Sequence, residues 1–128
     1  MGKVELVPAT AADCESAAIA LYGKVTAIPV RIAAFAGKLD GRVLGVGGVA
    51  FYPNGARVAF CDVGDEGRRH KIALHKAALM TIQLARALRV RRLLVTVNGM
   101  HEKTPRWIER LGFVRMEMGK EAAYVLDL

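Results

Sequence analysis

Four cationic or titratable side chains follow two glycines, Gly64 and Gly67, in the middle of the chain. They are Arg68, Arg69, His70 and Lys71. The hydrophobic periodicity of the following residues predicts that these four open a long helix. Cations are unfavourable at a helix N-terminus, unless an anion is held there by the free backbone N–H groups and the cations together. The pattern indicates either an anion site or a solvated basic helix start, and charge alone leaves both open.

Other reactive side chains lie near this cluster. His70 and His75 are five positions apart, whereas two metal ligands on one helix face are four apart, so no metal site is expected. Cys61 could act as a nucleophile beside His70 or His101. A cysteine in an apolar strand is more often a small buried packing residue, and that is the interpretation we adopt.

Periodicity and turn residues predict the elements that position these side chains. The expected elements are strand 4–7, helix 11–22, strands 30–39, 42–52 and 56–63, a loop at 64–67, helix 68–88, strand 93–97, a short helix from Thr104 that stops at Gly112, and strands 113–116 and 123–126. The order β-α-β-β-β-α-β-α-β-β predicts one α/β (α+β) domain over residues 1–128, with helices flanking a mixed, mostly antiparallel sheet.

The two later helices are expected to pack on the sheet. The long helix should present one apolar stripe to the core, made of Ile72, Ala78, Leu79, Ile82 and Ala85. Trp107 should attach the short helix to the sheet.

Composition limits the compartment and the ligand class. The chain of 128 residues is 53% hydrophobic, and its two cysteines do not make a disulfide framework. It shows no signal-peptide pattern and no apolar run of about 20 residues, so we expect a cytoplasmic protein. The net charge of +7 predicts an anionic ligand such as nucleic acid, acidic lipid or a phosphorylated small molecule.

The stretch from Gly45 to Ala50 matches the dinucleotide-binding pattern G-x-G-x-x-A. That pattern binds a pyrophosphate only where it opens a helix. Pro53-Asn54-Gly55 follows too closely for a helix, so we predict a glycine-rich strand that another backbone or a ligand approaches closely.

Several segments together resemble the GCN5-related N-acetyltransferases (GNAT). The stretch from Val63 to Ala73 is similar to their acetyl-CoA loop, V-x-P-E-Y-R-G-x-G-x-G/A, and includes Glu66, Arg68 and Ile72 in register. Segments 40–45, 91–98 and 106–113 resemble the hairpin, the next strand with its terminal asparagine, and the Y-E-R-L-G-F ending of that family. The resemblance runs from about residue 30 to the end of the chain.

This resemblance implies an acyl-CoA site with acetyl-CoA as co-substrate and no metal. Loop amides would bind the pyrophosphate, and the backbone near Cys61 and Val63 would hold the pantetheine arm and polarise the thioester. The cofactor-binding residues it implies are Cys61, Val63, Arg68, Arg69, His70, Lys71, Ile72, Ala73 and Asn98. An acceptor amine would attack the thioester directly, while a base and an acid move protons.

The sequence departs from the family pattern at three positions. Lys71 replaces the second loop glycine, where it could contact phosphates or exclude the cofactor. Ile108 stands where many members have a tyrosine acid, and Arg57 roughly where some have a glutamate base. Asp62 and His101 are the residues we expect to substitute as catalytic groups, each with a plain structural role as its alternative.

We therefore expect an acyl-CoA-dependent N-acetyltransferase that acts on a small-molecule or peptide amine. One alternative is a catalytically degenerate relative that binds a partner. A basic nucleic-acid-binding module is less favoured, because aromatic residues for stacking are few. A homodimer is a further option, with apolar strands at 51–52 and 124–126 as candidate interfaces.

Overall fold

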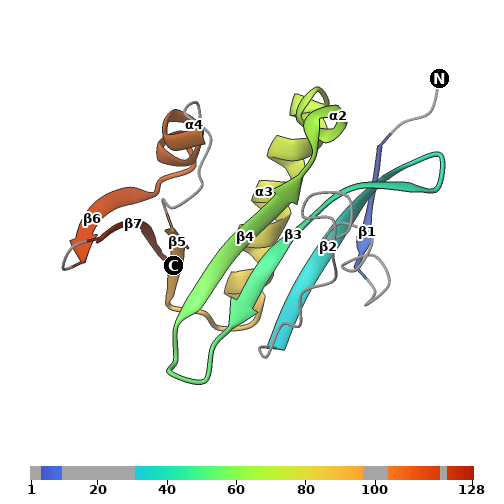
Figure 1. Ribbon diagram of the computed structural model, residues 1–128. Helices are drawn as coiled ribbons and strands as arrows, with labels where there is room; N and C mark the ends of the chain where they lie inside the picture. Colours follow the sequence, from blue (N-terminus) through green and yellow to red (C-terminus); the bar gives the residue numbers. More distant parts are fainter. Residues whose placement is uncertain (1–3, 10–30, 97–103, 119–120) are drawn as a thin grey trace.

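The computed structural model describes residues 4–9, 31–96, 104–118 and 121–128. Within these residues, seven strands form one sheet in the order β1-β2-β3-β4-β5-β7-β6 (Figure 1). The elements are β1 (Glu5–Pro8), β2 (Arg31–Leu39), β3 (Arg42–Phe51), β4 (Arg57–Val63), α2 (Asp65–Arg68), α3 (Lys71–Ala87), β5 (Arg92–Thr96), α4 (Thr104–Arg110), β6 (Val114–Met118) and β7 (Glu121–Asp127). The predicted mixed, mostly antiparallel sheet is confirmed. The helix expected at 11–22 lies outside the described residues.

Strands β2 to β4 form the expected antiparallel meander, and its two turns fall where the sequence predicts them. Strand β1 pairs with the other edge of β2, also antiparallel. Asp40 and Gly41 join β2 to β3 with φ values of 50° and 81°, the positive values that a tight two-residue hairpin requires. At the next turn, Oδ1 of Asn54 accepts a 2.9 Å hydrogen bond from the backbone N–H of Ala56. Gly55 in that turn has a φ of 92°.

The glycine-rich stretch lies inside β3, which confirms that it is a strand. A Cβ atom at Gly48 would collide with the carbonyl oxygen of Ala33 in β2. Glycine at this position therefore serves the close approach of two neighbouring backbones.

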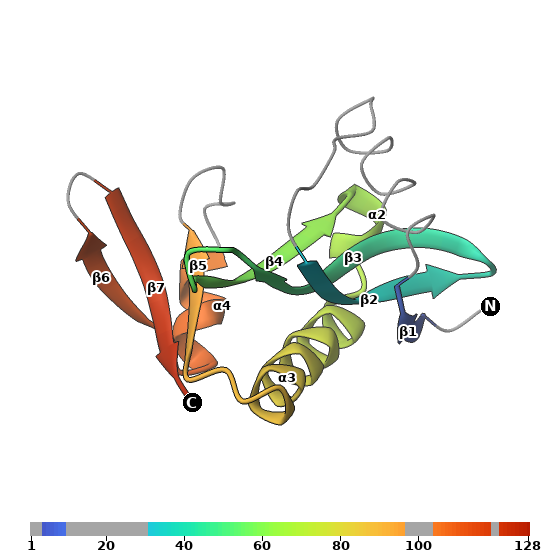
Figure 2. The same cartoon turned by 90° about the horizontal axis from the view of Figure 1, so that it is seen from below.

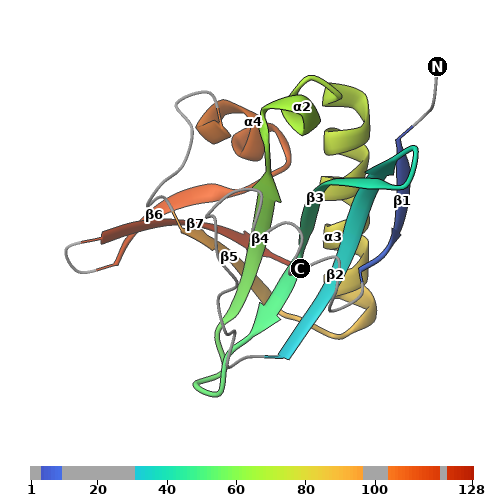
Figure 3. The same cartoon turned by 45° about the vertical axis from the view of Figure 1, so that its right-hand side comes forward.

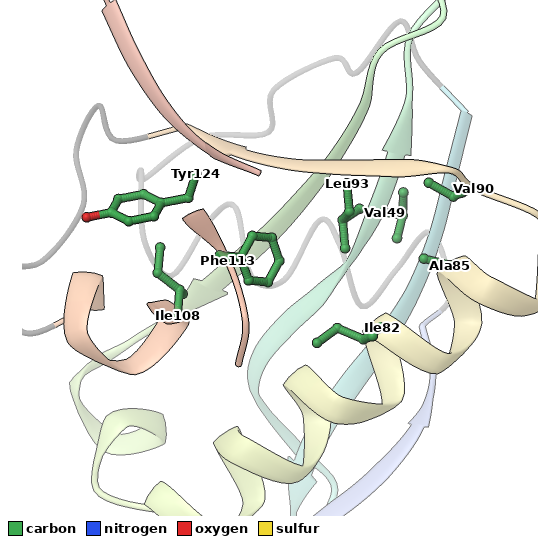
Figure 4. Packing of buried hydrophobic residues seen from close by; sticks show 8 residues of the cluster. All are labelled: Val49, Ile82, Ala85, Val90, Leu93, Ile108, Phe113 and Tyr124. Carbon is green, nitrogen blue, oxygen red and sulfur yellow. The ribbon is translucent and has the colours of Figure 1, made fainter. Parts of the chain in front are cut away.

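Helices α3 and α4 lie on the same face of the sheet (Figure 2). Residues from both helices, from the sheet and from the connections that follow the helices form one buried cluster (Figure 4). It comprises Val49, Ile82, Ala85, Val90, Leu93, Ile108, Phe113 and Tyr124. Trp107 packs against this cluster, and its Nε1 also donates a 3.0 Å hydrogen bond to Nδ1 of His75. The short helix is thus attached to α3 as well as to the sheet.

The apolar stripe predicted for α3 is partly wrong. Ile82 and Ala85 are buried, but Ile72 is 87% exposed and Leu79 is 44% exposed. The buried arc of the helix also contains Thr81, which is 8% exposed. At about 100° per residue, Ile72 and Leu79 lie far around the helix from the centre of that arc. Ile72 and Leu79 are seven residues apart and so share one side of the helix, but that side is not the one buried against the sheet.

The predicted helix start is also wrong. Residues 65–68 form the short helix α2 instead of a loop, and α3 begins at Lys71 instead of residue 68. Acidic Asp65 and Glu66 lie in the first turn of α2, and Arg68 lies in its last turn. Both placements suit the helix dipole, so Arg68 occupies a favourable helix end rather than an unfavourable one.

The described part of the chain contains no helix with the length and apolar character needed to cross a membrane.

Candidate functional site

Strands β4 and β5 open away from each other at the end of the sheet that carries α2. They run parallel and pair at Val58 and Leu94, and then diverge toward α2 (Figure 1). On its other side, β4 pairs with β3 over its whole length, from Arg57 to Val63. Within the described residues, no strand pairs with the β5-facing edge of segment 59–63. Such an edge presents backbone groups that can bind an extended ligand.

Neighbouring residues of β4 point to opposite faces of the sheet. Ala59 packs against the core cluster that contains Ile82 and Ala85 of α3. Cys61 and Val63 lie on the same face of β4 as Ala59. Cys61 and Val63 line a small cavity of about 50 Å³ together with residues of α3. Asp62 lies on the other face, which it shares with Phe60. The opening beside β4 is therefore bordered by Cys61 toward α3 and by Asp62 away from it.

Cys61 differs from the buried packing residue that we expected, because the residue as a whole is exposed. The surrounding protein nevertheless desolvates the thiol. This desolvation, with a smaller contribution from the charge of Asp62 and an opposing one from Arg68, raises the pKa of Cys61 to about 11. The thiol is protonated at neutral pH, which argues against a nucleophilic role because the thiolate is the nucleophile.

The first turn of α3 offers backbone donors next to this opening. The N-cap residue His70 makes no side-chain capping hydrogen bond, and its carbonyl accepts the N–H of Leu74 at 3.0 Å. The N–H groups of residues 71–73 precede that bond and have no carbonyl of an earlier helical turn to bind. They point along the positive end of the helix dipole, which favours an anion.

A groove of about 780 Å³ adjoins this helix start and extends to β1. Its lining residues are Val4, Leu6, Arg69, His70, Lys71, Ile72, Ala73, Lys76 and Met80. Three cations stand among apolar side chains, a combination that suits a ligand with both anionic and apolar parts.

Two contacts hold α2 in place beside the site. Arg42 at the start of β3 forms a bidentate ion pair with Glu66, with Nη–Oε distances of 2.9 and 3.1 Å. Gly67 is buried, and a Cβ atom there would lie 2.5 Å from Cγ1 of Val63 and 2.9 Å from the carbonyl oxygen of Leu44. The absence of a side chain at Gly67 therefore lets α2 sit directly on β3 and β4.

The structure brings most of the predicted site residues together. Cys61 and Val63 border the opening, and the α2–α3 segment holds Arg68, Arg69, His70, Lys71, Ile72 and Ala73. Asp62 lies on the same strand but on the opposite face. Asn98 and His101 lie outside the described residues. Sequence reasoning missed Lys76 and the β1 residues of the groove, because nothing local in the sequence shows that β1 lies beside α3.

Two residues at family positions have structural roles here. Arg57 lies at the far end of β4 from α2, with its guanidinium 5.0 Å from the ring centre of Phe51 and donating to the backbone oxygens of Tyr52 and Ala56. Ile108 is 5% exposed in the core cluster. Neither side chain can transfer a proton in this site.

Comparison with known proteins finds the same architecture in solved structures. No protein-family model matches the chain, and no curated protein matches it either. An N-acetyltransferase from Staphylococcus aureus Mu50 superimposes with a TM-score of 0.74 at 18% identity, covering 98% of both chains. The GNAT domain of PAT from S. lividans gives 0.69 at 15% identity, covering 98% of this chain and 90% of that one.

An acetyltransferase from Bacillus subtilis, solved in complex with CoA, gives a TM-score of 0.64 at 10% identity, covering 100% of this chain and 99% of that one. At these identities the likeness concerns the fold. The chain has the fold of the GCN5-related N-acetyltransferases.

Proposed function

We propose that this protein is an acyl-CoA-dependent N-acyltransferase that transfers an acetyl group from acetyl-CoA to a primary amine. The observation that carries the proposal is the opening between β4 and β5, which leads directly to the N-terminus of α3. Support comes from the shared fold, and from the CoA bound to the similar Bacillus subtilis acetyltransferase.

The phosphates of the cofactor are proposed to bind the backbone N–H groups of residues 71–73. Arg69 and Lys71 line the adjoining groove and add positive charge to this site. The pantetheine arm is proposed to lie along the free edge of β4 at residues 61–63, where main-chain groups hold an extended chain. This arrangement directs the thioester into the opening between the strands.

The acceptor amine is proposed to approach from the face of β4 that carries Asp62. Attack of the amine nitrogen on the thioester carbonyl forms the N–C bond, and loss of the CoA thiolate breaks the C–S bond. Asp62 or His101 takes the amine proton in this proposal, and the thiolate leaves with a proton from an acid or water. Positioning of amine and thioester in one opening supplies much of the rate enhancement.

The position of Lys71 helps to decide between this proposal and the alternative, a catalytically degenerate relative in which Lys71 excludes the cofactor. Its side chain is exposed and lines the open groove rather than the small cavity beside Cys61 and Val63. A lysine in this position supplies charge to a bound phosphate without filling the path of the pantetheine arm. We therefore favour a site that accepts the cofactor.

Calorimetric titration with acetyl-CoA tests the cofactor site. The natural protein should bind with a dissociation constant in the micromolar range, about −8 kcal/mol. Lys71→Ala should weaken binding several-fold, and more so at low salt, because a phosphate contact is screened by salt. Arg86→Ala, which removes an exposed cation from the last turn of α3, is the matched control. Binding by Lys71→Gly alone would support the degenerate alternative, and absence of binding by every variant would refute the proposal.

A pair of substitutions on β4 tests the two-sided arrangement. Asp62→Asn should lower kcat by about 10²–10⁴ if this residue is the base, with little change in acetyl-CoA affinity. Cys61→Phe should weaken acetyl-CoA binding at least tenfold, because a bulky ring would enter the opening from the α3 side. An Asp62 variant that loses cofactor affinity but keeps its turnover would contradict the assignment of the two faces.

A further inference from the structure

The two edges of the sheet differ in how they are protected. The edge strand β1 spans four residues and ends at Pro8, which has no N–H to donate. The opposite edge strand, β6, spans five residues from Val114 to Met118 and contains no proline. Natural proteins usually shield a strand edge from other chains by proline, short length or unfavourable charge. β1 carries a proline at its end, and β6 does not.

β6 also exposes apolar side chains. Val114 is 64% exposed and Met116 is 41% exposed, although both belong to a strand that is paired on one side. They share a face with their buried partners Val125 and Ala123 in β7. The apolar face thus continues to the rim of the sheet, where it stops without cover from any described residue.

The charges of β6 complement each other around its centre. Arg115 and Glu117 flank Met116 on the other face of the strand and are 57% and 74% exposed. Their own ion pair is long, at 3.6 Å, and solvent-exposed, so it contributes little stability. In an antiparallel pair of two β6 strands centred on Met116, Arg115 of each copy lies opposite Glu117 of the other. Directly opposite charges of this kind stabilise strand pairing, whereas like charges oppose it.

We propose that β6 is a homodimer interface, formed by antiparallel pairing with β6 of a second copy about a two-fold axis at Met116. The interface is isologous, since each strand presents the same residues to the other. It would join the two sheets into one continuous sheet and complete the hydrogen bonding of both edges. The expectation of an interface at 124–126 is wrong, because β7 is an inner strand in which Tyr124 and Val125 are 2% and 5% exposed.

Charge reversal tests the pairing without acetyl-CoA, so its result does not depend on the proposed function. Sedimentation of the natural protein should show a concentration-dependent dimer. Arg115→Glu and Glu117→Arg should each weaken it by about tenfold or more, since each places like charges opposite one another twice. The double variant with exchanged charges should dimerise again, and an equimolar mixture of the two single variants should form heterodimers. Circular dichroism is the control for folding, and each variant should keep the spectrum of the natural protein.

Cross-linking tests the position of the axis in a background with Cys14 and Cys61 replaced by serine. Met116→Cys places two thiols directly opposite across the axis, within reach of a disulfide after small adjustments. Val114→Cys on the same face lies two residues from the axis and should not cross-link. A protein that stays monomeric at all concentrations, a dimer insensitive to both charge reversals, or equal cross-linking of both cysteine variants would overturn the proposal.

Discussion

Replacing Gly67 by alanine measures how strictly the sheet positions α2. An added Cβ atom would lie 2.5 Å from Cγ1 of Val63 and 2.9 Å from the carbonyl oxygen of Leu44. The Val63 methyl can turn away, but the Leu44 oxygen belongs to β3 and also accepts the N–H of Gly64 at 3.4 Å. Relief therefore requires a shift of α2 itself. Overpacking of this kind costs about 1–3 kcal/mol.

The sign of the effect is informative because alanine favours helices. In an unhindered helix position, Gly→Ala stabilises by up to about 1 kcal/mol. Urea unfolding should instead show Gly67→Ala to be destabilised by about 1–2 kcal/mol, with a thermal midpoint several degrees lower. Gly37→Ala is the control, because its Cβ would meet only side-chain atoms at 3.5 and 3.7 Å. If Gly67→Ala is as stable as Gly37→Ala, the close packing of α2 on β3 and β4 is refuted.

Three further predictions follow from side-chain contacts. Since the pKa of Cys61 is raised from its ordinary value of 9.0 to about 11, alkylation of its thiol at pH 7 should be slow and should accelerate up to about pH 11. The unfolded chain loses that proton first, so stability should fall as pH rises above about 9. Trp107→Phe and His75→Ala should each lower the free energy of unfolding by about 1 kcal/mol, because each removes the same hydrogen bond. In a double-mutant cycle, the double variant should therefore lose less stability than the sum of the two single losses. Removal of Arg42 should cost less than about 1 kcal/mol in thermal unfolding, because its ion pair with Glu66 is solvent-exposed.

The order of strands and helices could be predicted because local signals define it. Asp40-Gly41 and Asn54-Gly55 each specify a turn, and β-branched or alternating apolar residues fill the strands between them. The hairpin of β6 and β7 follows from the sequence, whereas the pairing of β7 with β5 could not be predicted in this way. It depends on contacts between distant segments, such as Leu94 with Val125, that no local pattern records.

The parts of the candidate site that are contiguous in the sequence could be proposed from it. The parts that depend on contacts between distant elements could not. The segment from Cys61 to Ala73 is contiguous, so the sequence alone could propose its residues as one site, and the structure places them at the end of β4, in α2 and at the start of α3. The exact start of α3 was missed because the charges at 65–68 stabilise a separate short helix. The burial of Gly67 could not be predicted from the sequence, because it results from contacts with Leu44 of β3 and Val63 of β4. The structural role of Arg57 could not be predicted either, because it depends on the ring of Phe51 in the neighbouring strand.

The proposed cofactor site depends more on backbone than on side chains, which is compatible with a fold that is shared at 10–18% sequence identity. A diverging strand edge and the free amides of a helix start can be provided by almost any residue types. Lysine at position 71 and isoleucine at 108 therefore leave the architecture intact, whereas positions such as Gly48 and Gly67 tolerate no side chain without movement of the backbone. In the proposed reaction, side-chain identity becomes decisive only where the acceptor amine would be recognised and its proton removed. On this argument, substitutions on the Asp62 face should separate substrates, and substitutions on the α3 face should affect every acyl donor alike.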